Sequence, residues 1–158
     1  MLIPILLFGQ NEPNTKIDLT KNNFYGEAHL GVISQLVMNY ERHIYSGQKV
    51  SWYGRVGFGY GLFLQNSSSI DYGWGGLGAI TMLTGKCNNH FEINAGAFIG
   101  NKSEESIILY EDYNGRSAFI PPIFNVGYRF QKPEGGFIFR ANAGIIALSL
   151  GLSFGYAF

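Results

Sequence analysis

Residues 147–158 read ALSLGLSFGYAF, and this stretch decides the fold. Large apolar side chains alternate with small ones along its whole length. The large positions are Leu148, Leu150, Leu152, Phe154, Tyr156 and Phe158. A period of two residues over this length predicts a β-strand with one apolar face. The opposite face holds only Gly, Ser and Ala, which would cover a soluble protein poorly.

The same alternation recurs through the rest of the chain and predicts eight strands. Their ranges are 24–32, 35–45, 49–64, 72–84, 89–100, 118–131, 135–145 and 147–158. Glycines interrupt the pattern within 72–84 and predict a bulge there. The loops expected at one end include 64–71 and 101–117. Because an even number of antiparallel strands closes without an exposed edge, we expect an all-β fold, a closed up-and-down antiparallel transmembrane β-barrel.

Six ionised side chains fall on the small, polar faces of these strands. They are Glu27, Glu41, Arg55, Glu92, Arg129 and Arg140. Three acids matched by three bases predict an internal ion-pair network, because an unpaired buried charge is costly. None of the six lysines falls on this face. The pattern favours a membrane barrel with its large side chains toward lipid; a soluble barrel or sandwich is the alternative.

The overall composition narrows the class of protein further. The chain has 158 residues, which suits one domain. Charged residues make up 14% of the chain, against about 25% in ordinary soluble domains. Lys and Arg together equal Asp and Glu at 11 each, so nucleic acid is not an expected partner. Cys87 is the single cysteine, which excludes an intramolecular disulfide and a Cys-rich zinc site.

Several segments resemble a family of small outer-membrane β-barrel proteins of Gram-negative bacteria, most of them uncharacterised. The segments are NYER at 39–42, GRVGFGY at 54–60, NHFE at 89–92, GYRFQKPEGGFIFR at 127–140 and GLSFGYAF at 151–158. The most specific part is YRFQKPEGG at 128–136. The resemblance spans most of residues 24–158 and implies a location in the outer membrane. The last strand also resembles the signal that the barrel-assembly machinery reads, which implies an assembly role for Phe154, Tyr156 and Phe158.

The start of the chain suggests processing. Residues 2–8, LIPILLF, precede Gly9 and resemble the end of a secretory signal peptide; a buried N-terminal strand is the alternative. We therefore expect a signal-peptide remnant at 1–10, a polar tail at 11–23 and an outer-membrane barrel domain at 24–158.

The candidates for chemistry are weak. Glu27 with His29, and Glu41 with His43, are spaced to share a strand face, as a metal site or an acid–base pair would require. We interpret them as polar fillers of the interior. Ser67–Ser69 have no His or Asp framework, and the glycines of 57–61 lie within a strand rather than before a helix. We therefore predict no catalytic, cofactor-binding or metal-binding residue.

Three functions remain open from the sequence. The favoured one is a structural or protein-interaction role in the bacterial envelope, without catalysis. A narrow porin-like channel for small solutes is the alternative. Eight strands enclose little interior space, but glycines on the inner face leave part of that space free of side chains. A membrane enzyme is the third. The expected partners are outer-membrane lipid, the barrel-assembly machinery and other envelope proteins.

Overall fold

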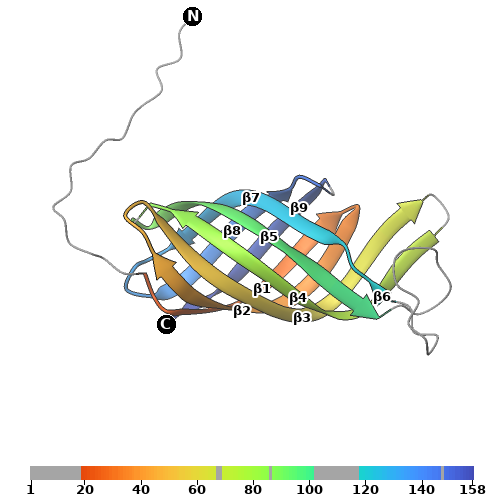
Figure 1. Ribbon diagram of the computed structural model, residues 1–158, viewed down its shortest axis with the longest axis horizontal. Coiled ribbons are helices and arrows are strands. Elements are labelled where there is room, and N and C mark those ends of the chain that lie inside the picture. Colours follow the sequence, from red (N-terminus) through yellow and green to blue (C-terminus); the bar gives the residue numbers. More distant parts are fainter. Residues whose placement is uncertain (1–18, 67–68, 86, 102–117, 147) are drawn as a thin grey trace, which may run out of the picture.

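The computed structural model describes residues 19–66, 69–85, 87–101, 118–146 and 148–158, which form one antiparallel sheet closed on itself (Figure 1). The elements are β1 (Asn22–Gly31), β2 (Ile33–Ser46), β3 (Val50–Asn66), β4 (Ser69–Thr84), β5 (Asn89–Asn101), β6 (Ala118–Phe119), β7 (Pro122–Gln131), β8 (Gly136–Gly144) and β9 (Ser149–Ala157). Within the described ranges, no helix has the length and apolar character needed to cross a membrane.

The closed sheet confirms the predicted eight-stranded barrel. Its strand order is β4-β3-β2-β1-β9-β8-β7-β5-β6, and pairing between β4 and β5 completes the circle. The elements β6 and β7 both pair with β5 and together form one barrel strand. The sequence predicted an unbroken strand at 118–131, which is wrong, because Pro121 and Pro122 have no N–H to donate to the ladder. Phe98 N bridges the break by donating to Pro121 O at 3.1 Å.

The glycine-rich strand β4 differs from its prediction. Its pairing with β3 runs without a shift from Val50↔Thr84 to Leu64↔Ile70, so the predicted bulge within 72–84 is wrong. Gly75 of β4 serves another purpose together with Gly61 of β3, since a Cβ on either would lie within 3 Å of the Phe98 ring. The predicted loop at 64–71 is also wrong, because both strands continue and leave only residues 67–68 between them.

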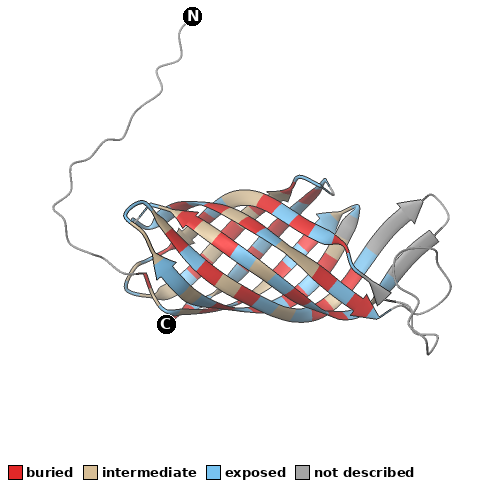
Figure 2. Ribbon diagram, in the orientation of Figure 1, coloured by how far each residue is buried: buried red, intermediate tan, exposed pale blue. Residues whose placement is uncertain are grey.

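The two faces of the barrel have opposite character. Buried and exposed residues alternate along the strands in Figure 2. Leu30 and Leu150 are 74% and 72% exposed, whereas Arg129 and Arg140 are completely buried. This distribution is the reverse of the one in soluble proteins.

The barrel has two distinct ends. At the terminal end, the first and last strands meet, with Asn22 N donating to Phe158 O at 2.9 Å. The β3–β4 hairpin extends beyond the other strands at the opposite end, which we call the far end (Figure 1). Leu19, Tyr53 and Leu83 form an apolar cluster inside the terminal end. Four other residues form a second apolar cluster toward the far end: Val37, Leu77, Phe98 and Ile123.

Candidate functional site

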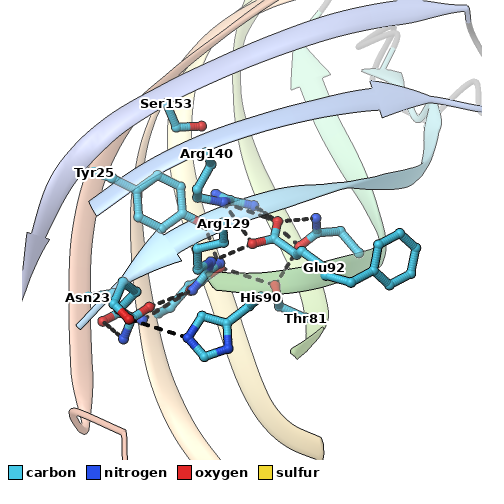
Figure 3. A network of polar contacts seen from close by, with 12 residues as sticks. Asn23, Tyr25, Thr81, His90, Glu92, Arg129, Arg140 and Ser153 are labelled. Atoms are coloured by element: carbon cyan, nitrogen blue, oxygen red, sulfur yellow. Dashed lines mark hydrogen bonds and ion pairs between the residues drawn. The ribbon is translucent and has the colours of Figure 1, made fainter. Parts of the chain in front are cut away.

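The six charged residues predicted on the inner face form one chain of alternating charges across the barrel. The order of ion pairs is Arg55–Glu27–Arg140–Glu92–Arg129–Glu41. All six side chains are at most 1% exposed. The strands that carry them are far apart in sequence, but barrel closure turns their polar faces toward one axis (Figure 3).

The first carboxylate of this ion chain, Glu27, has a partner on both oxygens. Arg55 donates to its Oε1, and Arg140 Nη1 donates to Oε2 at 3.0 Å. Ser153 Oγ also donates to Oε2, at 3.1 Å. These contacts balance the charge and replace the water that the carboxylate loses on burial.

The other two carboxylates share Arg129. Its guanidinium donates to both oxygens of Glu41, at 2.8 and 3.0 Å, and its Nε donates to Glu92. The two-fold contact with Glu41 is the fork geometry that makes arginine suited to carboxylates. Arg140 also reaches Glu92, so that this carboxylate lies between two guanidinium groups.

The ion chain contacts every strand of the barrel. Its charged members come from β1, β2, β3, β5, β7 and β8. Ser153 of β9 joins through Glu27, and Thr81 of β4 donates to Glu41 Oε1 at 3.1 Å. The ion chain therefore links all eight strands of the barrel through side-chain contacts, in addition to the backbone hydrogen bonds between neighbouring strands.

Tyr25 lies at the centre of the ion chain, and the sequence analysis missed its role. Its hydroxyl donates to Glu41 Oε1 at 2.5 Å. The centre of its ring lies 4.3 Å from Cζ of Arg140 and within 6 Å of Cζ of Arg55 and of Arg129. Such contacts stabilise desolvated cations. Its place between Asn23 and Glu27 on the inner face was the available signal.

Apolar side chains lie on both sides of the ion chain along the barrel axis. Toward the terminal end, Tyr53 and Leu83 pack with Leu19, although Leu19 was expected in a polar tail. Toward the far end, Phe98 and Ile123 belong to the second apolar cluster. The charges thus sit between two apolar clusters along the barrel.

The histidines serve as interior hydrogen-bonding groups. His29 Nε2 lies 3.3 Å from Glu27 Oε1, while His43 contacts Ser46 Oγ at 2.8 Å rather than Glu41. His90 lies against the carbonyl oxygens of Thr84 and Gln131. In the part of the chain that the structure describes, no group of three or more His, Cys, Asp and Glu side chains is arranged to hold a metal ion.

Other predicted features fall at the surface or outside the described residues. Phe154, Tyr156 and Phe158 point outward and are 55%, 60% and 58% exposed. Cys87 is also exposed. The signal-peptide remnant at 1–10, most of the tail at 11–23 and most of the loop at 101–117 lie outside the described residues, as do Ser67 and Ser68.

The fold and its two faces define the class of protein. An apolar outer surface around a polar, ionised core, enclosed by an antiparallel sheet that closes on itself, is the arrangement of an outer-membrane-type β-barrel. An apolar surface of this extent is incompatible with the soluble alternative. The protein is therefore an integral membrane β-barrel of the outer-membrane class.

Comparisons with known proteins give likeness of shape only. No protein-family model matches the chain, and no curated protein matches it in sequence. Among solved structures, it is similar to Ail, the attachment invasion locus protein of Yersinia pestis. The match has a TM-score of 0.41 for Ail alone and 0.42 for its complex with the heparin analogue sucrose octasulfate. Each match has 11% identity and covers 87% of this chain and 95% or 96% of the other.

Proposed function

We propose that this protein is a non-catalytic component of the bacterial outer membrane that acts as a structural element or through contacts with other envelope proteins. The observation that carries the proposal is the filled interior. The alternating ion chain occupies the middle of the barrel, and apolar clusters lie on either side of it. A solute would have to displace both, so activity belongs to the surfaces of the barrel rather than to its lumen.

The paired state of the carboxylates supports a role without catalysis. Glu27, Glu41 and Glu92 each bond to one or two arginines and to a further side chain. A general base needs a free lone pair within reach of a substrate. The lone pairs of these carboxylates instead accept hydrogen bonds from arginine. The alternative function is a porin-like channel, and evidence of solute passage would replace the proposed structural role.

Planar-bilayer recording separates the two functions. The full chain, folded into lipid, is expected to give no stable conductance steps, and Arg140→Ala serves as the comparison. Steps in the wild-type protein that change with Arg140→Ala would identify a channel and overturn the structural role. Cross-linking and pull-down from native membranes then look for envelope partners, with Arg42→Ala as a surface control.

The outward residues of β9 support a proposed role in assembly. Phe154, Tyr156 and Phe158 present aromatic rings on the lipid-facing side of the last strand, where lipid and the assembly machinery are the proposed partners. Deletion of Phe158 is expected to lower the yield of barrel in the outer membrane. A normal yield of heat-modifiable protein from that variant would contradict the proposal.

A further inference from the structure

A small polar hollow lies near the far end of the barrel, apart from the ion chain. Its polar lining comes from Gln35 of β2, Asn125 of β7 and Ser149 of β9. Gly144 of β8 forms part of the wall. The hollow offers about 10 Å³ to the centre of a water-sized sphere, which is room for about one water molecule.

Two of the lining side chains have polar atoms that no described group satisfies. Gln35 Oε1, an acceptor, and Asn125 Nδ2, a donor, lack hydrogen-bond partners among the described residues. The two residues are only 7% and 3% exposed. Nearly all buried polar groups in folded proteins bond to protein or to ordered water, so these two atoms point to a hydrogen-bonding ligand in the hollow.

Gly144 packs closely against two polar side chains of the wall. A Cβ on Gly144 would lie 3.2 Å from Asn125 Oδ1 and would press against Ser149 Oγ. The absence of a side chain at this position therefore leaves room for Ser149 and Asn125 to line the hollow.

Polar contacts continue from the hollow toward the ion chain. Ser149 Oγ lies 3.5 Å from His29 Nδ1. The other ring nitrogen of His29 lies 3.3 Å from Glu27 Oε1. The hollow is thus the outermost member of a polar path that ends at a carboxylate of the ion chain.

We propose that the hollow is a binding site for an ordered water molecule, which accepts a hydrogen bond from Asn125 Nδ2 and donates one to Gln35 Oε1. Water suits the site because it both donates and accepts, and because the hollow has room for about one water molecule. Ile123, a member of the second apolar cluster, also lines the hollow, so the hydrogen bonds come only from the polar side chains of its wall.

Nuclear magnetic resonance of the full chain in lipid nanodiscs tests the site. Magnetisation transfer from water to the side-chain amide of Asn125 is expected, with the sign of a long-lived bound water. The amide of Asn39 is an internal control, because it is buried and donates to Val37 O at 3.2 Å. Absence of transfer to Asn125 in the wild-type protein would overturn the proposal.

Two variants decide whether the signal comes from the hollow. Gly144→Ala displaces Ser149 Oγ and crowds Asn125, so it is expected to abolish the transfer. Gly78→Ala is expected to preserve it, because a Cβ there meets no atom within 4 Å. Gln35→Met removes the acceptor with little change in shape, and decides the question if Gly144→Ala does not fold. Transfer that persists in Gln35→Met, or in a folded Gly144→Ala, would rule the site out.

Discussion

The barrel interior has two polar regions, the ion chain and the region around Asn142. They differ in how completely their buried polar atoms are hydrogen-bonded. In the ion chain, each carboxylate has several partners, and Arg140 alone bonds to Glu27 and Glu92. Toward the far end, Asn142 is 6% exposed, yet neither of its amide atoms has a partner among the described residues. Charged groups cannot be left in that state, because an unpaired buried ion costs far more than an unpaired amide. The ion chain is therefore expected to dominate stability, and the polar region around Asn142 to tolerate change.

The largest expected effect breaks the ion chain at its centre. Arg140→Met leaves Glu27 and Glu92 each short of a cation, and we expect the free energy of unfolding to fall by about 3–5 kcal/mol. Urea titration in lipid vesicles, followed by heat-modifiable gel migration, measures it. Arg42→Met is the control, because Arg42 is exposed. Equal small losses from both variants would show that the ion chain does not stabilise the barrel.

A smaller effect is expected from Tyr25→Phe, which keeps the ring beneath Arg140 but removes the 2.5 Å bond to Glu41. Hydrogen bonds to charged groups contribute about 1.5–3 kcal/mol, and the same urea titration should detect that loss. The matched control is Tyr40→Phe. In the wild-type protein the Tyr40 hydroxyl donates to Asn22 Oδ1 at 2.7 Å in an exposed position. Tyr25 would have no special role if both variants lost the same stability.

The smallest effect is expected in the polar region around Asn142. Asn142→Leu removes two unsatisfied atoms and keeps the approximate shape, so we expect a change within about 1 kcal/mol of zero. Asn94→Leu provides the contrast, because Asn94 bonds to Thr81 and Glu92 at 2.6 and 2.5 Å. Its loss should exceed that of Asn142→Leu by about 1.5–3 kcal/mol. The reverse order would contradict the distinction between the two regions.

Much of the barrel could be predicted from residue alternation. The inner and outer faces of β9 follow from the strict period of residues 148–158, and the inward position of Arg129 and Arg140 follows in the same way. The break at Pro121 was also open to prediction, because two successive prolines have no N–H to donate to the ladder. The unbroken register of β4 was not, because it depends on which strand lies alongside. A run of glycines permits either a bulge or space for a ring, and only Phe98 on the neighbouring strand decides between them.

The sequence by itself determined that six charges face inward and that apolar side chains face outward, because side chains on a strand alternate with a period of two. It did not determine the order Arg55–Glu27–Arg140–Glu92–Arg129–Glu41, nor the place of Tyr25 at its centre. Strand tilt and closure bring residues distant in sequence to the same height on the barrel axis. The tertiary structure alone decides which acid meets which base, and where a polar group is left for water.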